Sequence, residues 1–199
     1  MTITAHAGAM GSKPNTLESI EVCVRVASII EVDVRFRGGV PILSHDKNCN
    51  GPLLEDCLAL VAGSEAGINL DLKERSGIPS VVSLVRQYGL EGRAFFTGVC
   101  ADDAEAVKES GLAYYLNCVP RGKNTAALVK TAEALGCAGL NIPYKTAGAK
   151  LLEEAHAAGL LVSVWTVDRV RAMRRMVRLG VDNITTRRPD ICGGLPHAI

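Results

Sequence analysis

The chain alternates short runs rich in β-branched residues with longer stretches whose apolar residues recur every three or four positions. The first pattern predicts buried strands and the second predicts amphipathic helices. Glycine, which tolerates the left-handed backbone of a helix end, closes five of the helical stretches. We expect eight strands, at 2–5, 29–34, 67–72, 94–97, 113–118, 139–142, 160–165 and 181–184.

Helices are expected between the strands. Asn15 is predicted to cap the first, with Glu18 as its capping-box partner. Residues 35–39 predict a hairpin-like extension that returns through 40–44. Further helices are expected at 53–62, 80–88, 102–110, 125–135, 147–158 and 169–179.

Eight strands that alternate with helices predict a parallel sheet, and closing that sheet gives a (β/α)8 TIM barrel. The 199 residues are expected to form one compact domain, 1–199, with minimal loops. An open, doubly wound sheet is the alternative. Gly8 and Gly11 are too sparse for the glycine motif of a pyrophosphate site after the first strand.

Strand parity favours the barrel. In 67–72 and the residue after it, Asn69, Asp71 and Lys73 share one face, and apolar residues share the other. Glu31 and Asp33 likewise oppose apolar neighbours in 29–34. The apolar face would meet helices, and the polar face would line the barrel near the strand ends, where barrel active sites lie.

Composition narrows the function classes. The net charge is +1, so no global field favours nucleic acid or an acidic membrane surface. The chain start lacks the features of a signal peptide, and no apolar run approaches the roughly 20 residues of a membrane span. Seven scattered cysteines without a CxxC pair indicate reduced thiols. We expect a cytoplasmic protein with neither nucleic acid nor membrane as partner, and predict no oligomeric state.

Three polar runs suggest chemistry: Glu31–Asp33, His45–Asp46 and Asp71–Lys73. The two carboxylates of the first run point to one face, about 7 Å apart along the strand, so both can reach one cation. Asp71 would add a third oxygen ligand. An all-oxygen set favours Mg²⁺ or Ca²⁺ over zinc, with Mn²⁺ also acceptable.

His6 and His45 stand at strand or loop ends beside these carboxylates. One imidazole would act as general base and the other as general acid. Asp46 would orient a histidine or hold a water, and Lys73 would pair with a phosphate oxygen or balance the carboxylates. Such a set suggests phosphate ester chemistry.

These residues resemble the glycerophosphodiester phosphodiesterase family of phospholipase-C-like barrels. The matching segments are Ala5-His-Ala-Gly8, Pro14-Asn-Thr-Leu17, Glu31-Val-Asp-Val34, Gly39-Val-Pro-Ile-Leu-Ser-His-Asp46, Asn69-Leu-Asp-Leu-Lys73, Val164-Trp-Thr-Val-Asp168 and Gly180-Val-Asp-Asn-Ile-Thr-Thr-Arg-Arg-Pro-Asp190. The resemblance implies that Glu31, Asp33 and Asp71 bind the divalent ion, that His6 and His45 are the acid/base pair, that Lys73 contacts phosphate, and that Trp165 walls the alcohol pocket.

The chain departs from the family pattern at several positions. The family usually has an arginine where Ala7 stands, and a glutamate between Pro14 and Asn15. The phosphate therefore loses a bidentate clamp, which Arg35, Lys13 or Arg121 would replace. Asp71 stands where a glutamate is usual. The segment between His45 and the third strand is short, which predicts a barrel without the usual capping insertion.

We therefore expect an enzyme, a divalent-metal phosphodiesterase that hydrolyses a glycerophosphodiester or a similar small phosphodiester. One alternative is a weakened barrel that binds a phosphorylated ligand without turnover. The other is a metal-dependent sugar-phosphate isomerase or aldolase-type barrel, although the loops after the last two strands lack the glycines of a phosphate site.

Overall fold

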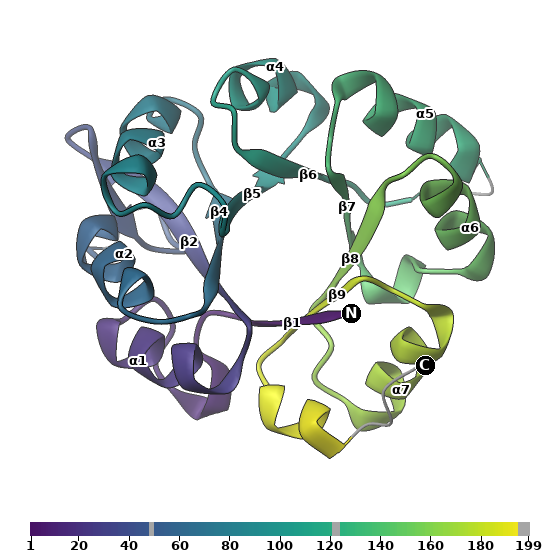
Figure 1. Ribbon diagram of the computed structural model, residues 1–199, viewed down its shortest axis with the longest axis horizontal. Coiled ribbons are helices and arrows are strands. Elements are labelled where there is room, and N and C mark those ends of the chain that lie inside the picture. The colour runs from purple at the N-terminus through teal and green to yellow at the C-terminus, as the bar shows by residue number, and fades with distance from the viewer. Residues whose placement is uncertain (48–49, 121–123, 195–199) are drawn as a thin grey trace.

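Eight parallel strands close into a barrel in the computed structural model, which describes residues 1–47, 50–120 and 124–194 (Figure 1). The first strand pairs with both the second and the last, which closes the sheet and rules out the open alternative. Going round the barrel, the strands are β1 (Thr2–Ala5), β2 (Ile29–Arg37), β4 (Gly67–Leu72), β5 (Ala94–Val99), β6 (Ala113–Asn117), β7 (Gly139–Pro143), β8 (Leu161–Trp165) and β9 (Asn183–Thr186).

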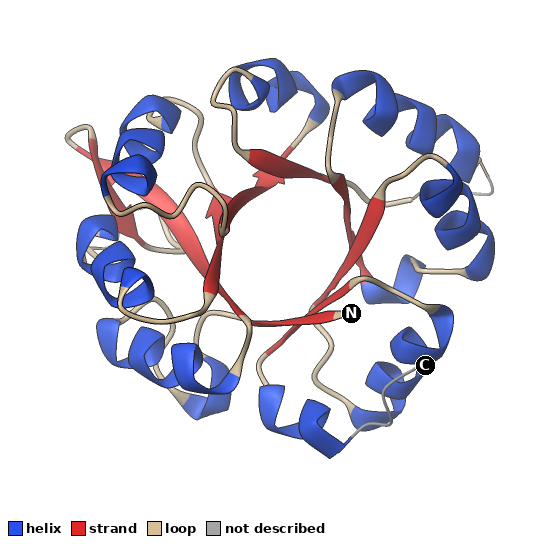
Figure 2. Ribbon diagram, viewed as in Figure 1, coloured by secondary structure: helices blue, strands red, loops and turns tan. Residues whose placement is uncertain are grey.

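Helices surround this ring of strands (Figure 2). They are α1 (Leu17–Val26), α2 (Leu54–Ala62), α3 (Ile78–Gln87), α4 (Ala104–Lys108), α5 (Thr125–Leu135), α6 (Ala149–Ala157) and α7 (Val170–Leu179), with short 3₁₀ turns η1 (Ala9–Gly11), η2 (Ala101–Asp103), η3 (Tyr144–Thr146) and η4 (Pro189–Gly194). The (β/α)8 TIM barrel predicted from the sequence is thus confirmed. No helix in the described part of the chain is long and apolar enough to cross a membrane.

A hairpin extends β2 beyond the barrel. The antiparallel strand β3 (Val40–Leu43) pairs with residues 34–37 of β2, as the sequence predicted. The described residues between β3 and β4 add α2 and no further helix. The barrel therefore lacks a capping subdomain among its described residues at this point.

Local boundaries differ from the prediction, and three of the differences concern a helix cap, a divided helix and the last strand. Thr16, and not Asn15, caps α1, because its side chain accepts a hydrogen bond from the Ser19 amide. Two elements, η2 and α4, replace the single helix expected at 102–110. The last strand spans Asn183–Thr186 and not 181–184, because the main-chain amide of Val181 still bonds to the end of α7, at the Met176 carbonyl.

Apolar side chains on the outer strand face meet the helices, and polar ones fill the inside. Ile30, Val32 and Val34 are fully buried on the outer face of β2. Inside, Thr4 Oγ1 donates to Asn183 Oδ1 at 2.9 Å, and Asn183 Nδ2 donates to Ser163 Oγ at 3.0 Å. Such bonds compensate for the loss of water around buried polar groups, so the barrel can carry a polar interior up to its mouth.

Two aromatic rings fill the barrel near the start of its strands. The Phe95 and Tyr115 ring centroids lie 5.1 Å apart. Gly139 pairs with both Tyr115 and Leu161. A Cβ atom at Gly139 would overlap the Leu161 carbonyl and approach the Tyr115 ring to 2.8 Å. Position 139 therefore has no room for a side chain, and only glycine fits there.

Gly139→Ala should lower the free energy of unfolding by about 2 kcal/mol, because it overpacks backbone against a rigid ring. Gly92→Ala is the matched control, since no atom lies within 4 Å of its added Cβ, and should change the free energy by no more than about 0.5 kcal/mol. Urea titration followed by circular dichroism measures both. Equal stability of the two variants would contradict this account of the barrel interior.

Candidate active site

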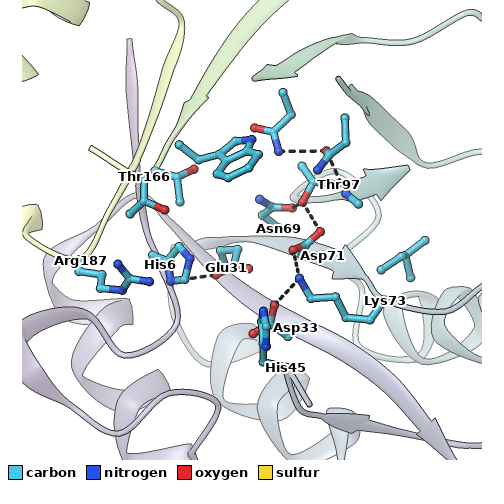
Figure 3. A pocket seen from close by; sticks show the side chains of 16 residues that line it. His6, Glu31, Asp33, His45, Asn69, Asp71, Lys73, Thr97, Thr166 and Arg187 are labelled. Atoms are coloured by element: carbon cyan, nitrogen blue, oxygen red, sulfur yellow. Dashed lines mark hydrogen bonds and ion pairs between the residues drawn. The ribbon is translucent and has the colours of Figure 1, made fainter. Parts of the chain in front are cut away.

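A cavity of about 570 Å³ opens at the C-terminal ends of the strands, and each barrel strand, or the residue after it, contributes to its wall. The cavity gathers seven of the nine residues that the sequence singled out: His6, Glu31, Asp33, His45, Asp71, Lys73 and Trp165. Figure 3 shows most of them facing a common space. Arg35 and Asp46 lie outside the lining residues.

Three carboxylates converge on the wall formed by β2 and β4. Register places Asp33 opposite Asp71 and Glu31 opposite Asn69. Each acid offers an oxygen, and these oxygens lie within 4.8 Å of one another. Burial, together with the charges of Asp33 and Asp71, raises the pKa of Glu31 to about 8. This concentration of buried negative charge and oxygen donors suits a divalent cation such as Mg²⁺ or Ca²⁺.

Lys73 partly balances that charge. Its Nζ lies 2.8 Å from Asp33 Oδ1 and 2.5 Å from Asp71 Oδ2. Burial alone would lower the pKa of Lys73, but the two carboxylates raise it above its ordinary value. The ammonium is therefore a permanent positive charge at the cavity.

Neighbours fix the orientation of two of the acids. The Asn15 amide donates to Asp33 Oδ2 at 2.7 Å, and Asn15 Oδ1 accepts from the Asp33 main-chain amide at 3.1 Å. Asn15 does this from a left-handed backbone, φ 57°, which asparagine tolerates better than most residues. The Ala7 amide donates to Glu31 Oε2 at 2.9 Å. Hydrogen bonds from Lys73 and Asn15 lower the pKa of Asp33, although burial alone would raise it.

A β-bulge at Gly98 makes room for the third acid. The β5–β6 register shifts between Phe96 and Val99, and Gly98 adopts φ 76°. A Cβ atom here would lie 2.5 Å from Asp71 Oδ1 and would overlap the Leu72 carbonyl. Thr97 Oγ1 lies 3.3 Å from Asp71 Oδ1 and donates to Asn69 Oδ1 at 2.8 Å. Only glycine fits this approach of strand to carboxylate.

The two histidines flank the carboxylates. His6 Nδ1 lies 3.0 Å from the Ala7 carbonyl and 3.7 Å from Glu31 Oε2. A carbonyl only accepts, so Nδ1 carries the proton of the neutral ring and Nε2 keeps its lone pair. Burial lowers the pKa of His6. His45 is more open, with a side chain 71% exposed, and its Nδ1 lies 3.2 Å from Asp46 Oδ1.

The candidate phosphate contacts lie in different places. Arg35 Nη1 binds Glu74 Oε1 at 2.8 Å, and its Nε donates to the His45 carbonyl at 3.0 Å. Lys13 is not among the residues that line the cavity, and Arg121 lies outside the described residues. The cavity wall includes Arg187, which sequence reasoning did not single out. Its signal was weak, because it follows the last strand in a run of two threonines and two arginines.

Comparison with known proteins places the chain in a family. The glycerophosphoryl diester phosphodiesterase family matches residues 64–191, more than half of the chain. This segment contains Asp71, Lys73 and Trp165. The other acids and both histidines of the cavity lie before it, at positions 6, 31, 33 and 45. A search of curated proteins finds no match.

Solved structures share the fold. An Oleispira antarctica phosphodiesterase in complex with the product sn-glycerol-3-phosphate is 21% identical, with TM-score 0.82 over 97% of this chain and 96% of that one. A glycerophosphodiester phosphodiesterase from Agrobacterium tumefaciens is 20% identical, with TM-score 0.79 over 98% and 100%. One from Thermotoga maritima is 19% identical, with TM-score 0.77 over 98% of each chain.

The barrel, the carboxylate and histidine cavity at its mouth, and the family match agree with one another. The chain belongs to the glycerophosphoryl diester phosphodiesterase family, a family of phosphoric diester hydrolases.

Proposed function

We propose that this protein is a divalent-metal-dependent phosphodiesterase that hydrolyses a glycerophosphodiester, or a similar small phosphodiester, to an alcohol and a phosphomonoester. The observation that carries the proposal is the placement of both His6 and His45 in one cavity with Glu31, Asp33 and Asp71. Acid/base groups and a cluster of oxygen ligands are the two requirements of metal-assisted cleavage of a phosphate ester.

Glu31, Asp33 and Asp71 would hold the cation. Their all-oxygen character favours Mg²⁺ or Ca²⁺, with Mn²⁺ also acceptable. The bound ion would neutralise charge on the phosphoryl oxygens. Lys73 lies between Asp33 and Asp71 and would hold a phosphate oxygen beside them with its ammonium.

Proton transfer falls to the imidazoles. The nucleophile is a hydroxyl, either of a water or of the substrate itself, in which case a cyclic phosphate forms first. One imidazole takes the proton of that hydroxyl while its oxygen bonds to phosphorus. The phosphorus–oxygen bond to the alcohol breaks, and the other imidazole gives its proton to the departing oxygen. The lone pair at His6 Nε2 suits the role of base, and the proximity of Asp46 to His45 would orient the second ring.

The rest of the cavity would position the alcohol. Trp165 is a large side chain on the wall and is 36% exposed, so it would cover the alcohol of a small substrate. The Arg35 side chain would support the position of His45, because its Nε donates to the main-chain carbonyl of His45. The Oleispira antarctica neighbour holds sn-glycerol-3-phosphate as product, which supports a product of the same class here. The cytoplasmic location inferred from the cysteines remains a prediction.

Hydrolysis of glycerophosphocholine and glycerophosphoethanolamine should be detectable with Mg²⁺, Ca²⁺ or Mn²⁺ and should stop in EDTA. Asp71→Asn should lower the rate at fixed Mg²⁺ by about 100-fold or more, because it removes a ligand charge. Asp56→Asn, which changes an exposed acid of α2 outside the cavity, is the control. If the wild type turns over no diester with any ion, the protein is a binding barrel and the proposal is wrong.

His6→Ala and His45→Ala should each lower kcat by about 10²–10⁴-fold, the usual contribution of a positioned acid or base. His156→Ala is the control. His156 Nε2 lies 2.9 Å from Asp182 Oδ2, and His156 does not line the cavity. Steady-state assays and circular dichroism of each variant check the result. Wild-type kcat in a folded His6 or His45 variant would refute that residue's role.

A further inference from the structure

Two permanent cations line the cavity among the described residues, Lys73 and Arg187. Lys73 already contacts two carboxylates, Asp33 and Asp71, at 2.8 and 2.5 Å. The positive charge of Lys73 is therefore largely balanced by these two carboxylates. Arg187 belongs to a different wall, just after β9, and its charge is free of that cluster.

Arg187 is firmly held. Its main-chain amide donates to Asp168 Oδ1 at 2.8 Å, and its carbonyl accepts from the Met10 amide at 2.9 Å. Its Nη1 donates to Asp168 Oδ2 at 3.2 Å. One carboxylate thus fixes both backbone and side chain. A guanidinium has five N–H donors, so a contact through Nη1 leaves a donor edge for a ligand.

The guanidinium lies beside His6, on the opposite side of that ring from Lys73 and Asp71 (Figure 3). Burial lowers the pKa of His6, and the positive charge of Arg187 lowers it further, which agrees with their proximity. The cavity is therefore bordered by the acid cluster with Lys73 on one side and by Arg187 on the other. A small anion that reaches His6 meets Arg187.

The pairing of the two cations also favours this arginine. Lys73 pairs with Asp33 and Asp71 of the acid cluster. Arg187 pairs with Asp168, which is outside the residues that line the cavity. The end of β1 offers no cation, because Ala7 presents a methyl group and an amide already bonded to Glu31. Arg35, considered for this role in the sequence, binds Glu74 and does not line the cavity.

We propose that Arg187 binds the non-bridging oxygens of the phosphate group, as the cation that compensates for the absence of an arginine at position 7. This assignment rests on the proposed function for the identity of the substrate. The binding of a phosphate anion by Arg187 can nevertheless be measured without turnover.

The single tryptophan of the chain provides the measurement. Trp165 lines the same cavity, so its fluorescence should respond when inorganic phosphate or sn-glycerol-3-phosphate binds to protein saturated with Mg²⁺. Arg187→Gln should raise the Kd of both anions about tenfold or more, because it removes charged hydrogen bonds. Calorimetric titration of the same samples gives the Kd independently of the fluorophore.

Arg188→Gln is the matched control. Arg188 is the next residue in the chain, its guanidinium binds Asp190, and it does not line the cavity. The Kd of both anions for Arg188→Gln should equal that for the wild type. Arg187→Lys, which keeps the charge but loses the fork, should fall between the wild type and Arg187→Gln. Arg187→Met, which keeps the aliphatic stem, replaces Arg187→Gln if circular dichroism shows that the latter is unfolded.

The outcomes separate the two proposals. A weakened Kd in Arg187→Gln, with kcat/KM for the diester reduced in parallel, supports both. A weakened Kd in a protein that hydrolyses no diester supports the role of Arg187 and overturns the proposed function. A Kd for Arg187→Gln equal to that of the wild type, or no anion binding by the wild type in either measurement, overturns the role of Arg187.

Discussion

Repulsion among three carboxylates at the mouth of the barrel is the constraint on which the site depends. Glu31, Asp33 and Asp71 place oxygens within 4.8 Å of one another on two buried strands. Bringing such charges together out of water costs free energy unless cations and donors compensate. Lys73, Asn15 and the Ala7 amide supply part of that compensation. Burial and the charges of Asp33 and Asp71 still raise the pKa of Glu31 to about 8.

The barrel makes this concentration of charge tolerable. Apolar side chains of β2 and β4 point outward to the helices, so folding gains its hydrophobic burial on that side. The inner face can then be polar, provided that its groups bond to one another, as Thr4, Asn183 and Ser163 do. Rigid strands also fix the register of Asp33 against Asp71, which holds the oxygens in place before any ligand arrives.

Much of this could be read from the sequence because strand parity is a strict rule. The alternation of acids with Ile30, Val32 and Val34 placed Glu31 and Asp33 on the inner face, and the strand 67–72 was predicted with its observed bounds. The same rule put Asn69, Asp71 and Lys73 on one face of the next strand, and all three line the cavity. The (β/α)8 closure followed from the count of strand and helix patterns.

The rest depended on backbone conformations that no periodic pattern encodes. Asn15 was read as a helix cap, but its left-handed backbone aims its amide at Asp33, and Thr16 caps α1 instead. Gly98 fell outside the strand predicted at 94–97, whereas it lies in β5 and its bulge admits Asp71. Arg187 and Arg188 are adjacent, and only the turn after β9 decides that the first lines the cavity. Such turns follow from tertiary contacts, which here include the hydrogen bond from the Arg187 main-chain amide to Asp168.

The central claim is that the three carboxylates hold a divalent ion. Crystals of the protein soaked in Mn²⁺ and measured at the manganese absorption edge test it directly. The account predicts one anomalous peak with Glu31, Asp33 and Asp71 oxygens at about 2.0–2.6 Å. Absence of a peak there, with Lys73 still seated between Asp33 and Asp71, would contradict it.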